Sequence, residues 1–320
     1  MIQKVIKFSP IIKDKIWGGH KLQTLLGKEI GNLPNGGESW ELSAIDGNVS
    51  EISSGELKGM KLDQAIQQYK GELVGNKVYN KFGNNFPLLI KFIDANDNLS
   101  IQVHPNDEMA QKRHNSFGKT EMWYVLHAEP GAKLISGFAK HTNADEYEQL
   151  VASGEFVNVL GAHEVKRGDI FFMPAGRVHA IGKGVMVAEI QQTSDITYRV
   201  YDYNRRDAQG NTRQLHVAEA KEAINFADLD SGQKTYTLKK NDRTDVVDCQ
   251  YFHTGVVSVC GTAQRNYSAI DSFVILMCVK GNAMVDGTEL RLGQTAMIPA
   301  TVESVSITAT EDTELLEVWV

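Results

Sequence analysis

Apolar and polar residues alternate over short distances along this chain, and Gly, Asn or Asp separates most of the apolar stretches. PLLIKFIDA (87–95), EMWYVLHA (121–128) and VMVAEIQQ (185–192) have the length and composition of β-strands. Many short strands divided by turn residues are typical of a β-sandwich or β-barrel. Further strands are predicted at 98–104, 169–175, 195–203, 272–281, 282–287, 295–300 and 313–320.

Helical patterns are few and short. Apolar residues recur at roughly helical spacing in 61–75, 143–156 and 215–229. The polar segment 228–245 is expected to link two β units. The chain is therefore predicted to be mainly β, with a few short helices.

Two segments share a spacing of residues that indicates a duplication. AHEVKRGDIFFMPAGRVHAI (162–181) and GTELRLGQTAMIPATVESVSI (287–307) both contain a Gly, five further residues and then Pro-Ala. Only the first copy continues to a histidine, His179. This predicts two β-barrels, of which one keeps the side chains of a site. We place the first barrel, with short helical segments, in residues 1–230 and the second, degenerate one in residues 231–320.

The polar face of one predicted strand carries unusual groups. In NLSIQVHPND (98–107), a hydroxyl, an amide and an imidazole replace the charged groups that a strand normally presents to water. This face is interpreted as the wall of a site. The alternation assigns Leu99, Ile101 and Val103 to one side of the strand and Ser100, Gln102 and His104 to the other.

Composition narrows the class of protein. The 320 residues are 42% hydrophobic and 23% charged, which is ordinary for a soluble globular protein, and no apolar run has the roughly 18 residues of a membrane span. No signal peptide is recognised, and three widely spaced cysteines without a CxxC pair are expected to be reduced, so a cytoplasmic location is predicted. The net charge of −7 argues against a nucleic-acid partner. A small molecule is the expected partner, and the oligomeric state stays open.

A second motif supplies further polar side chains. Gly168, Pro174, Gly176 and His179 have the spacing G-x5-P-x-G-x2-H, which resembles the second metal motif of cupins. Cupins are jelly-roll barrels whose metal ligands come from the inner faces of strands. The two predicted barrels are therefore expected to be cupin-like jelly rolls, the second one without metal ligands.

The first cupin motif corresponds to Gln102, His104 and Glu121, with glutamine in place of the usual first histidine. A spacing of two puts Gln102 and His104 on one strand face, where both reach one ion. With His179, the set contains two imidazoles, one carboxylate and one amide oxygen. Such a set suits Zn²⁺ and leaves a position for water or substrate, so one zinc ion per chain is predicted. Iron stays an alternative.

Longer stretches show a closer resemblance. PLLIKFIDANDNLSIQVHPND (87–107), GKTEMWYVL (118–126) and PAGRVHAI (174–181) are similar to type I mannose-6-phosphate isomerases, also called phosphomannose isomerases. SDITYRVYDYNR (194–205) is similar to the shorter bacterial members. The resemblance implies reversible conversion of mannose 6-phosphate to fructose 6-phosphate. It also implies a zinc site at the four positions named above.

Strand alternation nominates the remaining catalytic residues. Lys119 precedes Glu121 by two residues, so it is expected beside the metal, where a lowered pKa would let it act as base or acid. Asp195, Thr197 and Arg199 are expected to share a second face of the cavity. Arg199 would hold sugar oxygens or stabilise an enediolate, and Asp195 would orient Arg199 or move protons. The alternatives are a solvated Lys119 and a structural Asp195–Arg199 ion pair.

Candidates for binding the rest of the substrate are fewer, because the chain has no Gly-rich phosphate loop and no strongly basic cluster. Ser100 lies on the ligand face, and Lys91 in LLIKFI needs a partner among its apolar neighbours, so both are candidate phosphate contacts. Trp17 and Trp40 are candidates for the floor of a sugar site, with a core position as the alternative.

Two other functions stay open. One is a non-catalytic cupin that senses a sugar phosphate, which turnover of mannose 6-phosphate would exclude. The other is an iron-dependent cupin oxygenase, which metal analysis and dioxygen dependence would separate from an isomerase.

Overall fold

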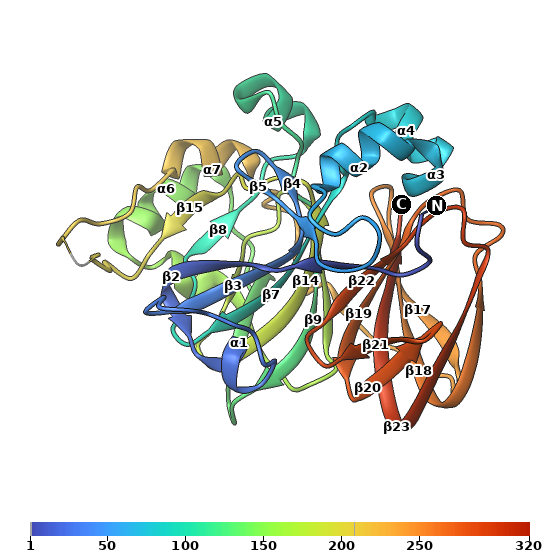
Figure 1. Cartoon of the computed structure of the whole chain (residues 1–320). Helices are drawn as coiled ribbons and strands as arrows, with labels where there is room; N and C mark the ends of the chain where they lie inside the picture. Colours follow the sequence, from blue (N-terminus) through green and yellow to red (C-terminus); the bar gives the residue numbers. More distant parts are fainter. Residues whose placement is uncertain (1, 208) are drawn as a thin grey trace.

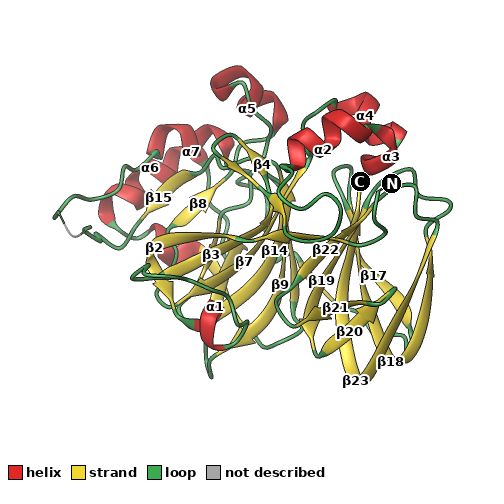
Figure 2. Cartoon of the chain, in the orientation of Figure 1, coloured by secondary structure: helices red, strands yellow, loops and turns green. Residues whose placement is uncertain are grey.

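The computed structural model describes residues 2–207 and 209–320, and it is mainly β, as predicted (Figure 1). Short helices lie around the sheets (Figure 2). Within the described ranges, no helix is long and apolar enough to cross a membrane. The helices are α1 (Lys21–Thr24), α2 (Leu62–Tyr69), α3 (Gly71–Val74), α4 (Asn76–Phe82), α5 (Asp107–His114), α6 (Ala144–Ser153) and α7 (Val217–Ala223), with a 3₁₀ helix η1 (Phe156–Val159).

Three charged residues of the central sheet lie on the same face. Because side chains alternate along a strand, β7, β14 and β9 direct Lys91, Glu189 and Glu121 to the same side, whereas Ile90 and Ile190 lie in the core on the opposite side. In order, the sheet contains β16 (Gln233–Lys234), β12 (Ile170–Met173), β9 (Glu121–Ala128), β14 (Val185–Gln192), β7 (Leu88–Ala95), β3 (Gly36–Leu42) and β2 (Ile11–Gly19).

A second sheet faces the charged side of the central sheet. Leu134 and Ile181 of this sheet pack with Trp123 and Val187 of the central sheet in one hydrophobic cluster. The outer face of the second sheet packs against α6, α7 and η1, next to β15 at the left of Figure 1. In order, it contains β11 (Leu160–Glu164), β10 (Lys133–Phe138), β13 (His179–Ile181), β8 (Ile101–Val103) and β15 (Tyr198–Tyr201).

The third sheet encloses a separate core and covers the other side of the central sheet. Val257, Leu276 and Leu315 belong to its own core, whereas Phe252, Phe273 and residues of α2–α4 pack with the central sheet. Its path is β17 (Asp242–Asp248), β18 (His253–Asn266), β23 (Ser304–Trp319), β19 (Val274–Lys280), β22 (Thr295–Ile298), β1 (Ile6–Ser9) and β6 (Glu51–Ile52), with β20 (Asn282–Val285) and β21 (Thr288–Arg291) attached. A small hairpin joins β4 (Ala44–Ile45) to β5 (Asn48–Val49).

The N-terminal strands contribute to both halves of the molecule. β1 pairs with β22, and β6 pairs with β1, so residues 6–9 and 51–52 belong to the sheet of the C-terminal half. The expected linker 228–245 also contributes to both halves, because β16 pairs with β12 and β17 begins at Asp242. The division at residues 230 and 231 stays a prediction, as does the jelly-roll topology of the two halves.

The predicted helices are present, and the strand predicted at 98–104 begins later, at Ile101. The pattern at 61–75 forms α2 and α3, that at 143–156 forms α6, and that at 215–229 forms the shorter α7. The prediction that Leu99 shares a face with Ile101 and Val103 is wrong. Leu99 precedes β8 in irregular chain, so it packs between the two sheets, whereas Ile101 and Val103 face the helices.

Candidate metal centre and active-site cavity

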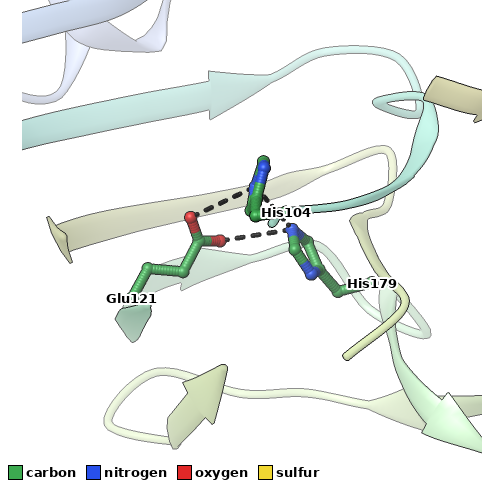
Figure 3. Close-up of side chains that lie close together, drawn as sticks. All are labelled: His104, Glu121 and His179. Carbon is green, nitrogen blue, oxygen red and sulfur yellow. Dashed lines mark hydrogen bonds and ion pairs between the residues drawn. The ribbon is translucent and has the colours of Figure 1, made fainter. Parts of the chain in front are cut away.

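Three side chains meet between the central and second sheets. Glu121 begins β9, His179 begins β13, and His104 directly follows β8, so two facing sheets supply the group (Figure 3). Among the described residues, these three form the one group of His, Cys, Asp or Glu side chains whose ligand atoms lie close enough to hold a metal ion, all within 4.8 Å. The structure therefore brings together the three predicted ligands of these residue types.

The ligand atoms of this group point at one another. His179 Nε2 lies 3.3 Å from Glu121 Oε1, and His104 Nε2 lies 3.4 Å from Glu121 Oε2. The two Nε2 atoms are 3.1 Å apart. All three side chains are almost completely buried, with exposures of 1% each.

Hydrogen bonds on the far side of each ring fix the histidines in the form that binds metal. His104 Nδ1 lies 2.8 Å from the carbonyl of Ile196, and His179 Nδ1 lies 2.9 Å from the carbonyl of Arg177. A carbonyl only accepts, so each Nδ1 carries the proton and each Nε2 keeps its lone pair. Such outer hydrogen bonds are typical of metal-bound histidines.

The carboxylate of Glu121 makes no hydrogen bond within the described protein. Both of its oxygens are buried without a hydrogen bond. Burial and the nearby Glu189 raise the pKa of Glu121 to about 8. A cation between these groups would stabilise the ionised carboxylate and would accept the two imidazole lone pairs that converge on the same point. The donor set therefore fits a divalent metal.

Gln102 is placed to complete the predicted ligand set. It is paired with His179 across β8 and β13, and its Nε2 lies 3.5 Å from Nε2 of His179. Rotation of the amide by a half-turn exchanges its nitrogen and oxygen, and it then directs Oε1 to the same point. Its role as a ligand stays a prediction.

Backbone hydrogen bonds connect the segments that carry the ligands. The N–H of Gly176 donates to the carbonyl of His104 over 3.0 Å, and the N–H of Ala175 donates to Thr120 Oγ1 over 3.2 Å. Gly176 has a φ of 90°, a backbone conformation that favours glycine, and this explains the glycine between proline and histidine in the motif.

A cavity of about 100 Å³ adjoins the three ligands and contains most of the predicted active-site residues. Lys119 and Gln102 line it and also contact the metal group, since Lys119 Nζ lies 3.8 Å from Glu121 Oε2. Of the predicted residues, the cavity is lined by Trp17, Lys91, Ser100, Gln102, Lys119, Thr197 and Arg199. Trp17 lines the cavity and also belongs to the hydrophobic core between the sheets, and its contact with a sugar stays a prediction.

Lys91 already has partners within the protein. Its Nζ lies 3.0 Å from Glu189 Oε1 and 4.0 Å from Glu38 Oε2. The partner that Lys91 was expected to need is thus supplied by Glu189 and Glu38, and its role as a phosphate contact stays a prediction. Glu189 also accepts from Trp123 Nε1 over 2.9 Å, and Glu38 accepts from Trp40 Nε1 over 2.6 Å, so Trp40 takes part in this buried network.

The two buried lysines of the cavity have opposite pKa shifts. Burial lowers the pKa of Lys91, but Glu189 and Glu38 outweigh it, and the net result is a raised pKa. Burial and the repulsion of Lys91 lower the pKa of Lys119. Opposite shifts of neighbouring groups are typical of sites in which the groups have different roles. The role of Lys119 as base or acid stays a prediction.

The prediction that Asp195 shares a face with Thr197 and Arg199 is wrong. Asp195 is exposed and lines a different cavity, of about 300 Å³, beside Phe117. β15 begins only at Tyr198, so the alternation does not extend back to Asp195. The structure therefore gives no support to a catalytic Asp195.

The cavity contains residues that the sequence patterns did not single out. Glu38, Glu189 and Trp123 belong to the buried network, and Lys15 and Arg213 line the wall. A signal for Glu189 was present, because it is the one charged residue in VMVAEIQQ. Arg213 had none, since it lies in a polar segment after β15.

The two buried histidines are expected to resist protonation in acid. Burial lowers the pKa of His179 from 6.5 to about 4 and that of His104 well below 6.5. We expect both imidazoles of the metal-free protein to stay neutral at about pH 5.5, where an ordinary histidine is mostly protonated. An NMR titration of the histidine ring signals checks this. Half-protonation of both rings near pH 6.5 would contradict it.

Comparisons with known proteins identify relatives of this chain. The family model of the catalytic domain of type I phosphomannose isomerases matches residues 5–131. The mannose-6-phosphate isomerase of Streptococcus mutans is 36% identical over 294 residues, which cover 91% of this chain and 90% of that protein. The mannose-6-phosphate isomerase ManA of Bacillus subtilis is 34% identical over 90% of this chain and 89% of that protein.

Solved structures share the fold over the whole chain. The mannose 6-phosphate isomerase from Bacillus subtilis has a TM-score of 0.88 and 30% identity, with coverage of 99% of this chain and 100% of that one. The phosphomannose isomerase from Salmonella typhimurium, at 19% identity, has the same fold with a TM-score of 0.82. On the identity and coverage of these relatives, the chain belongs to the type I phosphomannose isomerases and is an enzyme of this aldose–ketose isomerase family.

Proposed function

We propose that this enzyme interconverts D-mannose 6-phosphate and D-fructose 6-phosphate by proton transfer through an enediol, with one Zn²⁺ per chain. The observation that supports the proposal is the buried group of His104, Glu121 and His179 beside a cavity that contains Lys119 and Arg199. Zinc held by these three side chains and Gln102 would supply a Lewis acid for the substrate oxygens.

Lys119 is our candidate for the proton carrier. Conversion of an aldose to a ketose removes a proton from C2, returns one to C1 and moves another between the two oxygens. The neutral amine of Lys119 accepts the carbon-bound proton and returns it, so the lysine is unchanged after one turnover. Its lowered pKa makes the neutral form available closer to neutral pH.

Arg199 is our candidate for the group that holds the negative oxygen. It lies across from Gln102 in the pairing of β15 with β8, and Gln102 lies across from His179, so the three residues form a row across the second sheet. Arg199 Nε is buried without a hydrogen-bond partner. An N–H group without a partner inside a cavity is suited to donate to a developing oxyanion.

The phosphate group is proposed to bind at the arginine end of the cavity. Arg199, Arg205 and Arg213 gather around Asp202, which accepts from Arg213 Nε over 2.7 Å. Burial and the charge of Arg213 lower the pKa of Arg199, so an anion placed there would relieve the repulsion between the arginines. Ser100 lines the same cavity and is retained as a candidate phosphate contact.

Arg213→Ala is expected to raise KM for mannose 6-phosphate by about 10- to 100-fold and to change kcat little, because hydrogen bonds to a charged group contribute about 1.5–3 kcal/mol. Steady-state kinetics with the Arg206→Ala control, which removes an exposed arginine of the same loop, check this. An unchanged KM in Arg213→Ala would place the phosphate elsewhere.

A coupled assay that detects fructose 6-phosphate tests the proposed reaction. We expect turnover of mannose 6-phosphate, loss of turnover after chelation, and recovery on addition of zinc. In deuterated water, solvent deuterium in the product supports proton transfer through an enediol, whereas its complete absence supports a direct hydride shift. Binding without turnover would support the sugar-phosphate sensor instead, and a dioxygen-dependent, iron-loaded protein would support the oxygenase.

A further inference from the structure

The segment that carries Lys119 is held in place by side chains from distant parts of the chain. Residues 117–120 lie between α5 and β9 and belong to no helix or strand. The N–H of Gly118 donates to Asp107 Oδ1 over 2.8 Å, and the N–H of Thr120 donates to Gln192 Oε1 over 2.9 Å. The N–H of Lys119 itself donates to the carbonyl of Pro105 over 3.1 Å. The position of Lys119 therefore depends on this bond together with the side chains of Asp107 and Gln192, and not on a regular hydrogen-bond ladder.

The carboxylate of Asp107 is the centre of this arrangement. Besides the N–H of Gly118, Asp107 Oδ1 accepts from Gln192 Nε2 over 2.9 Å. Its second oxygen accepts from the hydroxyl of Tyr251 over 2.9 Å. Tyr251 lies in the connection between β17 and β18, so the C-terminal half of the molecule supplies one of the three donors.

Close packing transmits the position of Asp107 to Gly118. A Cβ atom on Gly118 would lie 2.6 Å from the N of Asp107 and 2.7 Å from the carbonyl carbon of Asn106. Gly118 is thus pressed against the first turn of α5, and a displacement of Asp107 displaces the residue before Lys119.

We propose that Tyr251, acting through Asp107 together with Gln192, is a positioning residue that fixes Lys119 relative to Glu121 for catalysis. This inference rests on the proposed function of Lys119. Tyr251, Asp107 and Gln192 line a separate cavity, of about 390 Å³, and none of them lines the cavity beside the metal group. They act through the backbone of residues 118–120 and do not touch the substrate.

The protonation state of Tyr251 suits this role. Burial and the hydrogen bond to Asp107 raise the pKa of Tyr251 to about 12, so the hydroxyl keeps its proton at neutral pH and donates. The C-terminal half then contributes one defined contact to the active-site segment in addition to apolar packing.

Tyr251→Phe is the direct test, with Tyr236→Phe as its matched control. Tyr236 also lies beyond residue 230, and its hydroxyl donates over 2.6 Å to the carbonyl of Gly168, away from residues 118–120. For Tyr251→Phe we expect kcat to fall by about 3- to 30-fold, below the roughly 100-fold that a displacement of about 1 Å costs, with KM and bound metal unchanged. Tyr236→Phe is expected to keep the wild-type kcat.

A double-mutant cycle shows whether Tyr251 acts through Asp107. Asp107→Ala is expected to lower kcat more than Tyr251→Phe, and the double variant is expected to match Asp107→Ala alone. Asp107→Asn, which keeps an acceptor for Gly118, is expected to recover most of the activity. Additive losses, or a wild-type kcat in Tyr251→Phe, would overturn the inference.

Hydrogen exchange of the peptide that covers residues 115–121 gives a readout independent of activity. We expect faster exchange there in Tyr251→Phe and not in Tyr236→Phe. An inactive wild-type enzyme would count against the proposed function, whereas unchanged exchange in Tyr251→Phe would count against the positioning role alone. Equal losses of bound metal and thermal stability in both variants would also overturn that role.

Discussion

His179→Ala is expected to leave the purified protein with almost no bound metal and with an isomerase activity more than about 100-fold below that of the wild type. Loss of an outer hydrogen-bond partner alone weakens metal binding by about 10- to 100-fold, and loss of a ligand removes more. Glu121 Oε1 lies 3.3 Å from His179 Nε2 and has no hydrogen-bond partner, so nothing in the described protein replaces the lost nitrogen.

His253→Ala is the matched control for this variant. His253 begins β18 in the C-terminal half, where its Nδ1 lies 2.7 Å from Asp248 Oδ1. We expect this variant to keep one metal ion per chain and full activity. Metal analysis and the coupled assay are applied to both. Full metal content in His179→Ala would refute the ligand assignment. Half of the original content would indicate a second metal site and would count against the prediction that residues 231–320 bind no metal.

The metal group was predictable because local spacing and strand period determine it. Gln102 and His104 are two residues apart, and both lie on the side of the second sheet that faces Glu121. His179 follows a proline–glycine turn that the motif itself encodes. The histidine ligands thus depend on short segments whose geometry the sequence specifies.

The charge network beside the metal could not be derived in the same way. Glu189 and Lys91 are directly opposite in the pairing of β14 with β7, and the two residues are 98 positions apart in the chain. Each was visible as a charge in a mostly apolar strand, but only the register of the sheet makes them partners. The arginine group was not predicted for the same reason. A turn and a loop bring Arg199, Arg205 and Arg213 together, and local spacing does not specify their geometry.

The secondary structure was also predictable only in part. Apolar strands such as β7, β9 and β14 were predicted within one or two residues, because burial on both faces requires apolar runs. α5 was missed, because its sequence DEMAQKRH has no apolar stripe and only Ala110 is buried. Its local signals are Asn106, whose side chain accepts from the N–H of Met109 at the start of the helix, and the acidic first turn and basic last turn of the helix.

Lys119→Met is expected to lower kcat by about 10²- to 10⁴-fold, which is the usual contribution of a group that transfers a proton in the transition state. Methionine has a similar length and suits the site, since Lys119 is only 6% exposed. Bound zinc is expected to stay normal, because Lys119 is not one of the predicted ligands and only neighbours Glu121, with Nζ 3.8 Å from Oε2.

Lys119→Arg separates proton transfer from electrostatic stabilisation. Arginine keeps a positive charge beside Glu121 but does not lose its proton. It therefore cannot take over the function of a lysine that works as a base. In the wild type, kcat is expected to fall as the pH drops below the lowered pKa of Lys119, since the neutral amine is then lost. The measurements are kcat, KM and bound zinc of both variants, with Lys133→Met as a control for an exposed lysine. Activity of Lys119→Arg close to that of the wild type would reduce Lys119 to a fixed cation, and near-normal kcat in Lys119→Met would remove it from the chemistry.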